Sequence, residues 1–175
     1  MSVQIRTSQT NKNMSDMTDM LVILRDLKPV ESELLELENH HGITIRKPIA
    51  PEKSILVDWV NTRFGAGWSS EVEVACSSVP SKCFVAQKEG ELLGFAVFDV
   101  SSRGFFGPTG VAEEYRGLGI GKILLVKSLE ALKDMGFAYA IIGGVGPVEF
   151  YKKTVGAMVI EGSSRSIYAN MLKRR

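Results

Sequence analysis

A short run in the second half of the chain combines three glycines with a basic residue at each end. It reads Arg116-Gly117-Leu118-Gly119-Ile120-Gly121-Lys122, and an apolar pattern with helical spacing follows it. Glycine lets the backbone approach a ligand closely and adopt left-handed conformations. The first turn of a helix carries N–H groups without intrahelical partners and a partial positive charge. The run therefore predicts an anion-binding loop at a helix N-terminus.

Two common phosphate-binding motifs do not fit this run. A P-loop needs Gly-x-x-x-x-Gly-Lys followed by Ser or Thr, whereas Gly121-Lys122 follows Arg116 and precedes Ile123. A dinucleotide fingerprint needs Gly-x-Gly-x-x-Gly, and the glycines here are spaced two and two. A glycine-rich helix start that binds nothing is the remaining alternative. Each glycine costs a helix about 1 kcal/mol, so a functional reason is favoured.

A second segment lies downstream and reads Glu149-Phe150-Tyr151-Lys152-Lys153-Thr154-Val155-Gly156-Ala157. It predicts a helix that begins at Pro147, carries an aromatic pair and ends at glycine. Together with the Arg-x-x-Gly-x-Gly run, this segment resembles the GNAT family of N-acetyltransferases. The resemblance covers residues 43–175, where the order of strands and helices is also similar to that of the family.

The resemblance implies an α/β fold with a mixed, mostly antiparallel sheet, flanked by helices, whose central parallel strands splay apart. Acetyl-CoA is the implied cosubstrate, bound between strands 105–111 and 139–142. The backbone of residues 117–122 is expected to hold its pyrophosphate, and the backbone of Val111 to bind pantetheine or polarise the thioester carbonyl. The implied cofactor-binding residues are Thr109, Val111, Arg116, Gly117, Leu118, Gly119, Ile120, Gly121 and Lys122.

The implied activity is that of an acyltransferase, in which a primary amine of a small molecule attacks the thioester directly. Amino sugars, polyamines and amino acids are candidate acceptors. The amine must lose a proton and the leaving thiolate must gain one. The family resemblance places Tyr151 near the sulfur as the catalytic acid, and its reference pKa of about 10 is near the 8.5 of a thiol. The alternative is a tyrosine packed in the helix core beside Phe150.

Three carboxylates are weighed as a general base, and none is chosen. Glu71, Glu73 and Asp99 each fit a solvated surface carboxylate better. The family often has an Asn after the strand at 139–142, but residues 143–147 read Gly-Gly-Val-Gly-Pro. This departure puts the catalytic geometry in question, not cofactor binding. Trp68 is near the expected acceptor site, although a packed indole is the favoured interpretation.

Two other functions remain open from the sequence. One is a non-catalytic acyl-CoA-binding sensor or interaction module that retains the fold. The other is transfer to protein lysines or N-termini. Lys and Arg number 21 against 20 Asp and Glu, giving a net charge of +1. This balance argues against nucleic acid or a membrane surface as a partner, while a homodimer stays possible.

The patterns that position these residues divide the chain at residue 42. Residues 1–42 are expected to be an N-terminal extension, disordered over 1–14 and then helical over 17–27 and 31–39. Residues 43–175 are expected to be the acetyltransferase domain. Pro108 and its neighbouring glycines predict a kink in the strand at 105–111. The domain's predicted strands are 43–46, 83–87, 92–100, 105–111, 139–142, 158–160 and 166–169, and its helices 51–64, 71–75, 119–135 and 147–155.

The remaining sequence signals are few. Cys76 and Cys83 lack a metal-type spacing and are expected to be reduced. His40-His41 has no evident third ligand, so no metal site is predicted. The polar start of the chain lacks an apolar signal core, and residues 20–24 are too short an apolar run to span a bilayer. These features favour a cytoplasmic protein.

Overall fold

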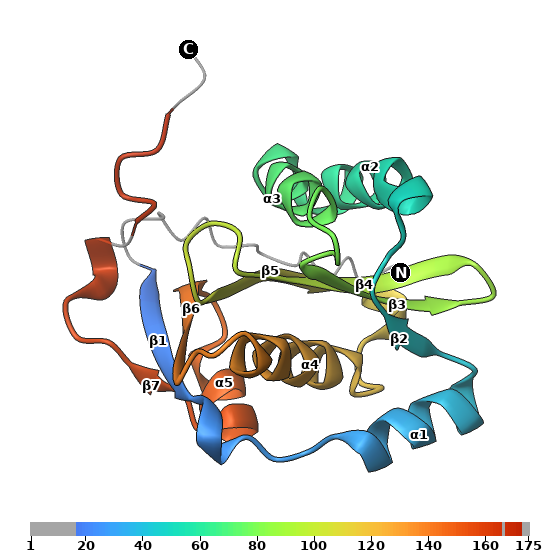
Figure 1. Ribbon diagram of the computed structural model, residues 1–175, viewed down its shortest axis with the longest axis horizontal. Coiled ribbons are helices and arrows are strands. Elements are labelled where there is room, and N and C mark those ends of the chain that lie inside the picture. Colours follow the sequence, from blue (N-terminus) through green and yellow to red (C-terminus); the bar gives the residue numbers. More distant parts are fainter. Residues whose placement is uncertain (1–16, 166, 173–175) are drawn as a thin grey trace, which may run out of the picture.

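The computed structural model describes residues 17–165 and 167–172, and the predicted disorder over 1–14 lies outside them. A seven-stranded sheet runs through the molecule in the order β2-β3-β4-β5-β6-β1-β7 (Figure 1). Neighbouring strands are antiparallel except for β5 and β6, which are parallel. The strands are β1 Thr18–Ile23, β2 Thr44–Arg46, β3 Cys83–Lys88, β4 Glu91–Phe98, β5 Phe105–Val111, β6 Tyr139–Val145 and β7 Met158–Val159.

Helices cover both faces of this sheet. Helices α2 and α3 lie on one face, and α4 and α5 lie on the other (Figure 1). The mixed α/β architecture expected from the sequence, with one parallel pair in a mostly antiparallel sheet, is confirmed. The helices are α1 Glu31–His41, α2 Lys53–Phe64, α3 Ala66–Cys76, α4 Ile120–Asp134 and α5 Val148–Val155.

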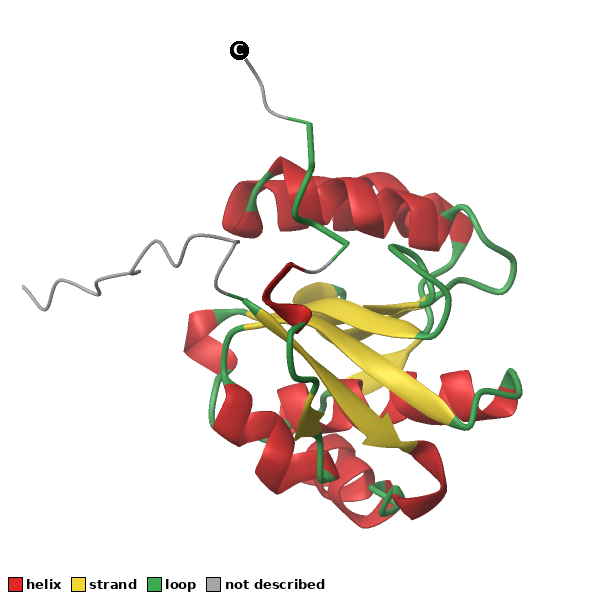
Figure 2. Ribbon diagram, turned by 90° about the vertical axis from the view of Figure 1, so that its left-hand side faces the viewer, coloured by secondary structure: helices red, strands yellow, loops and turns green. Residues whose placement is uncertain are grey.

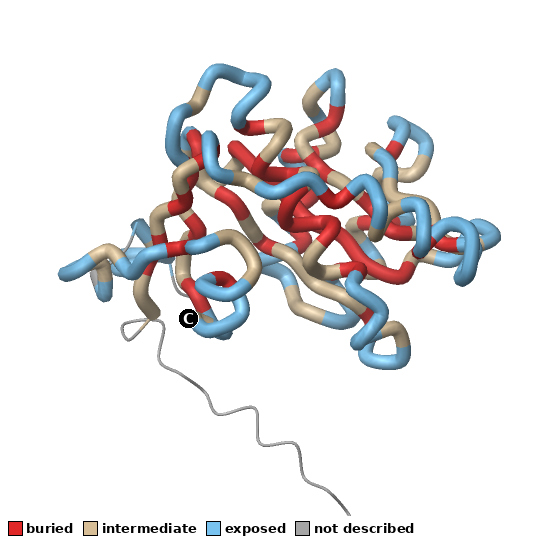
Figure 3. The backbone as a smooth tube through the Cα atoms, turned by 90° about the horizontal axis from the view of Figure 1, so that it is seen from below, coloured by how far each residue is buried: buried red, intermediate tan, exposed pale blue. Residues whose placement is uncertain are grey.

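Each face of the sheet has its own hydrophobic core. The larger one packs α4 against the sheet, and Figure 3 shows buried residues running through α4 and the strands while the outer helices are largely exposed. Apolar residues of α4 recur at positions 123, 126, 129 and 132, the helical stripe predicted from the sequence. The smaller core joins Leu56, Val60 and Val72 to Phe95 on β4. The sheet is therefore held in place from both sides.

The helix predicted over residues 17–27 is wrong. Residues 18–23 form strand β1, which pairs with β6 on one side and β7 on the other. Met20, Val22 and Leu24 are fully buried, and this spacing of two residues belongs to a strand rather than a helix. Part of the segment separated as an extension therefore lies inside the sheet.

The strand predicted over residues 166–169 is also wrong where the structure describes it. Residues 167–170 form a turn, and Ser166 lies outside the described residues. The ring of Tyr168 in this turn instead packs against Gly143 and Gly144 of β6. Other differences concern lengths: helix α3 is longer than the predicted 71–75, β4 ends at Phe98, and β6 extends to Val145.

The kink predicted near Pro108 is confirmed by the pairing of β5. Its register against β4 shifts between Ala96 and Phe98. On its other side, β5 pairs with β6 only at Phe105–Ile141 and Phe106–Ile142. Beyond these pairs the two strands diverge, which confirms the splay of the central parallel strands.

Cys76 and Cys83 are both free thiols, Cys83 being buried. None of the helices that the structure describes has the length and hydrophobicity needed to cross a membrane.

Candidate active site

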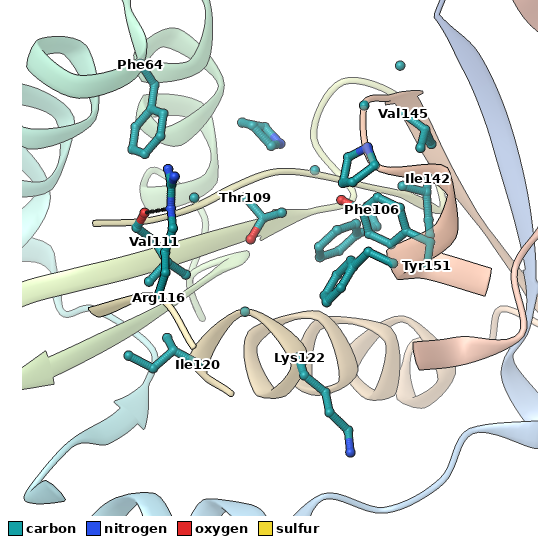
Figure 4. A pocket seen from close by; sticks show the side chains of 18 of the residues that line it. Phe64, Phe106, Thr109, Val111, Arg116, Ile120, Lys122, Ile142, Val145 and Tyr151 are labelled. Carbon is teal, nitrogen blue, oxygen red and sulfur yellow. Dashed lines mark hydrogen bonds between the residues drawn. The ribbon is translucent and has the colours of Figure 1, made fainter. Parts of the chain in front are cut away.

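A cleft of about 670 Å³ opens where β5 and β6 diverge (Figure 4). Its walls come from β5, the glycine run, the end of β6 and α5, with Phe64 and Trp68 on the α2–α3 side. Of the ten residues predicted for the site, only Leu118 is not part of the lining, and its side chain is exposed. The predicted residues in the lining are Thr109, Val111, Arg116, Gly117, Gly119, Ile120, Gly121, Lys122 and Tyr151.

The glycine run ends at the open N-terminus of α4. Gly119 is the residue before the helix and has a left-handed backbone with φ of 83°, and Gly117 has φ of 87°. No side chain caps this helix, and the N–H of Ile123 is the first to bond within it, to the carbonyl of Gly119 at 3.1 Å. The N–H groups of residues 120–122 therefore remain available at the positive end of the helix. This end suits an anion.

The backbone of Val111 faces the cleft because of its register against β4. The N–H of Ala112 donates to the carbonyl of Leu93 at 2.8 Å. Hydrogen-bonded and non-hydrogen-bonded pairs alternate along an antiparallel ladder, so the N–H of Val111, paired with Gly94, points away from β4. It points to the side where β6 has diverged. Such a donor can bind a carbonyl oxygen or an oxyanion.

The two basic side chains of the run lie differently. The Nε of Arg116 donates to the carbonyl of Val111 at 3.4 Å, and Figure 4 shows the guanidinium extending along that wall of the cleft. Lys122 turns away from the cleft, and its Nζ lies 2.7 Å from Oε1 of Glu33 on α1. Lys122 therefore presents its backbone rather than its ammonium to the cleft.

Tyr151 lies across the cleft from Val111 and Arg116 (Figure 4). Its ring contacts Phe106 edge-on, with centroids 6.4 Å apart, and only 6% of the residue is exposed. Burial raises the pKa of Tyr151 to about 12. The phenol is therefore protonated at neutral pH and can donate a hydrogen bond.

The glycines that replace the expected Asn are close to other groups at the end of β6. A Cβ on Gly143 would lie 3.0 Å from the ring of Phe105 and 3.4 Å from the ring of Tyr168. The N–H of Gly144 donates to Oδ1 of Asp19 at 2.8 Å. Position 143 therefore leaves little room for a larger side chain.

An aromatic wall closes the α2–α3 side of the cleft. The rings of Phe64 and Trp68 stack with centroids 5.0 Å apart, and Trp68 is 38% exposed. Trp68 is thus both packed, as the sequence favoured, and part of the cleft. Phe64 was not predicted from the sequence, where the glycine at 110 was the one sign of its close approach to β5.

Residues 54–157 match the sequence model described as the acetyltransferase (GNAT) family. The chain belongs to the GNAT family of acetyltransferases. This confirms the resemblance drawn from the glycine run and the Tyr151 segment. No curated protein sequence matches the chain.

Solved structures share the GNAT fold at low sequence identity. One is a GCN5-related glucosamine N-acetyltransferase region of a fungal multi-domain GH3 β-N-acetylglucosaminidase, with 18% identity and a TM-score of 0.66 over 82% of this chain. Another is a GCN5-related N-acetyltransferase from Sphaerobacter thermophilus, with 19% identity and a TM-score of 0.62 over the same share. The matches cover 20% and 48% of those two chains, so this GNAT chain spans only part of their length.

The three carboxylates weighed as a base have different surroundings in this GNAT chain. The side chain of Asp99 is fully buried and lies 2.9 Å from Lys82 and 3.2 Å from Arg103. Glu73 is exposed and pairs with Lys53 at 3.3 Å. These two carboxylates are therefore neutralised by neighbouring cations.

Glu71 differs from both, because it is half-buried and no salt bridge joins it to a cation among the described residues. Burial raises its pKa, and a hydrogen bond from Ser101 opposes that shift. Within the described part of the chain, no group of three His, Cys, Asp or Glu side chains is arranged to hold a metal ion.

Proposed function

We propose that this GNAT chain transfers an acetyl group from acetyl-CoA to a primary amine of a small molecule. The observation that carries the proposal is the common cleft shared by three groups. The open N-terminus of α4, the inward N–H of Val111 and the phenol of Tyr151 all border it. They suit, respectively, a pyrophosphate, a thioester carbonyl and a leaving thiolate.

The cosubstrate is proposed to follow β5 into the splay. Its pyrophosphate binds the N–H groups of residues 117–122, and its pantetheine arm runs beside Thr109 and Val111. Thr109 has the same strand alternation as Val111, and its hydroxyl already donates to the carbonyl of Phe95 at 3.0 Å. Because of this alternation, the N–H of Thr109 points to the side from which β6 has diverged. The pantetheine arm is proposed to lie there along β5, as an added strand would.

The reaction is a direct displacement at the thioester carbon. The neutral amine forms the new C–N bond, and the N–H of Val111 stabilises the oxyanion that develops on the carbonyl oxygen. The C–S bond then breaks, the sulfur takes its electron pair, and the proton that the amine loses passes to water. Tyr151 donates its proton to the departing sulfur and regains one from that water, so the products are the amide and the free CoA thiol. Because the pKa of Tyr151 is about 12, it retains its proton until charge appears on the sulfur.

A small acceptor is favoured by the enclosure of the cleft. Phe64 and Trp68 stand over β5 on the side opposite the glycine run, and Phe64 and Phe95 pack with centroids 5.7 Å apart. Residues 143–145 at the end of β6 line the other side. A small amine fits between these walls at a lower desolvation cost than a folded protein surface.

Thiol release tests this proposal. Acetyl-CoA is incubated with a panel of amino sugars, polyamines and amino acids, and free CoA thiol is measured. Tyr151→Phe is expected to lower kcat by about 10²-fold while calorimetry gives an unchanged affinity for acetyl-CoA. Tyr139→Phe, which removes a hydroxyl from an exposed tyrosine, is the matched control.

Three outcomes would contradict the proposal. Wild-type turnover in Tyr151→Phe would remove the catalytic role of the phenol. Tight binding of acetyl-CoA without thiol release for any amine would favour a non-catalytic acyl-CoA-binding module. Release with histone-like peptides alone would instead assign the chain to protein lysines.

A further inference from the structure

Glu71 lies on α3 next to the part of the cleft that Trp68 lines, although Glu71 itself is not among the lining residues. It follows Trp68 by three residues on α3, so the two side chains share one face of that helix. Its Oε1 accepts a hydrogen bond from the hydroxyl of Ser101, in the loop between β4 and β5. The carboxylate is thereby fixed over the side of the sheet that α2 and α3 cover.

Tyr168 connects this carboxylate to the cleft lining. Its ring lies against Gly143, a cleft residue, at 3.4 Å from the position of an added Cβ. Ser101 lies near its hydroxyl and opposes the rise in its pKa. Figures 1 and 2 show that the segment 167–172 rises on the same side of the sheet as α2 and α3. Ser101 thus lies between the Glu71 carboxylate and a ring that borders the cleft.

The carboxylates beside this end of the cleft are not paired with a cation among the described residues. The negative charges of Glu71 and Asp19 both act to raise the pKa of Tyr168, although its burial is the larger cause. Asp19 is 7% exposed and accepts the N–H of Gly144, another cleft residue. No salt bridge joins either carboxylate to a Lys or Arg within the described residues, whereas Asp99 has two such partners. Burying an unpaired carboxylate is costly.

The aromatic wall beside Glu71 adds a second feature suited to a cation. Trp68 is partly exposed in the cleft one helical turn before Glu71. The face of an indole attracts an ammonium group, and a carboxylate alongside provides a charge-assisted hydrogen bond. The reacting nitrogen cannot use this feature as an ammonium, because it must be neutral to attack. A cation held here belongs to another part of the acceptor.

Resting on the proposed acetyltransferase function, we propose that Glu71 binds a second, positively charged amino group of the acceptor. The acceptors of this cleft are then diamines or longer polyamines. The distal ammonium sits between Trp68 and the Glu71 carboxylate, and the neutral amine reaches the thioester. Ser101 is a positioning residue, because its hydroxyl orients the carboxylate through a hydrogen bond.

A matched pair of amines and a matched pair of variants test this inference. The probes are 1,4-diaminobutane and butylamine, which share the carbon chain and differ in the distal ammonium. Glu71→Gln removes the charge but keeps an acceptor for Ser101, and Glu73→Gln removes an exposed carboxylate from the same helix. KM and kcat are measured by thiol release, and binding to the CoA-loaded protein is measured by calorimetry.

The expected result is a preference of wild-type protein for the diamine by about tenfold in KM. Glu71→Gln is expected to raise KM for the diamine by that factor, to leave butylamine unchanged and to alter kcat little. Glu73→Gln is expected to keep the preference. Ser101→Ala is expected to weaken the preference for the diamine partly. Thermal unfolding checks that the variant is folded, because a loss of folding would reduce turnover of both amines alike.

Binding to the CoA-loaded protein separates this inference from the proposed function. Diamine binding that depends on Glu71, without any acetyl transfer, supports the cation site and contradicts the transferase. Acetyl transfer to both amines with no effect of Glu71→Gln on the diamine overturns the cation site and leaves the transferase standing. An equal rise in KM for the diamine and for butylamine in Glu71→Gln also overturns the cation site, because it shows a general structural role of Glu71.

Discussion

The ring of Phe64, the last residue of α2, lies directly against Gly110 on β5. A Cβ built on Gly110 would be only 2.5 Å from Cζ of Phe64. The contact fixes the height of the aromatic wall above the strand that is proposed to hold the pantetheine arm. A glycine that looks like a weak point in a strand is therefore a site of close approach between two elements.

Gly110→Ala is expected to lower the free energy of unfolding by about 1–3 kcal/mol, because the methyl group must displace the Phe64 ring. Gly67→Ala is the control, since nothing lies within 4 Å of its added Cβ and its position is helical. Urea unfolding measures both. Combining Gly110→Ala with Phe64→Leu should recover part of the loss. Simple additivity of the two single changes would show that they do not interact.

Gly119→Ala is expected to weaken acetyl-CoA binding by about 5- to 30-fold, because a left-handed alanine costs roughly 1–2 kcal/mol and shifts the N–H groups of α4. Gly136, after the other end of the helix, also has positive φ, at 93°, and open space around it. Gly136→Ala should therefore lose similar stability without losing affinity. Calorimetric titration with acetyl-CoA separates the two effects. Equal affinities would remove the helix start from the binding site.

The pH dependence of turnover follows from the raised pKa of Tyr151. A phenol with a pKa of about 12 remains protonated from pH 7 to pH 10. Its deprotonation should therefore produce no alkaline fall in kcat over this range. Tyr151→Phe should lower kcat by a constant factor at each pH. A fall centred near pH 10 that disappears in the variant would show that the site does not shield the phenol in the working enzyme.

Acid sensitivity of the fold should depend on Asp99. Although burial opposes its charge, hydrogen bonds from Lys82 and the N–H of Gly104 and the nearby charge of Arg103 hold its pKa below the usual 3.8. The stabilisation is present above pH 3.8 and is lost as pH falls through the depressed pKa. Asp99→Asn should lower the free energy of unfolding at pH 7 by roughly 1.5–3 kcal/mol.

Denaturant unfolding at pH 7 and at pH 3 checks this expectation. Asparagine tolerates the left-handed backbone of position 99, where φ is 57°, so the variant tests the charge. The gap between wild type and Asp99→Asn should narrow at the lower pH. Asp26→Asn, in an exposed pair with Arg25, is the control and should show little change. A gap that is independent of pH would mean that the ion pairs contribute nothing.

Local patterns were enough to predict much of this fold. The stripe of α4, the glycine run before it and the β3–β4 hairpin depend on neighbouring residues, and all three lie where the sequence placed them. Strand β1 was misassigned because its short apolar run fits both helical and strand spacing. Its pairing with β6, more than a hundred residues away, decides the outcome.

Sequence reasoning could propose candidate site residues only where they lie together in one short motif. Residues 116–122 and Tyr151 came from local runs, whereas the contacts of Phe64 and Glu71 join distant segments. Ser101 is 30 residues from Glu71, and no spacing rule connects them. The turn at 167–170 has a similar cause, because Tyr168 packs against Gly143 and Gly144 on the distant strand β6.

The location of β1 has a consequence for how the chain is made. The ribosome completes residues 18–23 early, yet their neighbours β6 and β7 emerge only after residues 139–145 and 158–159. Until then β1 has no partner strand, and its apolar side chains remain uncovered. Pairing between such distant segments slows folding and prolongs exposure to aggregation. Nascent chains stalled before residue 139 should therefore depend on chaperones that shield an unpaired strand.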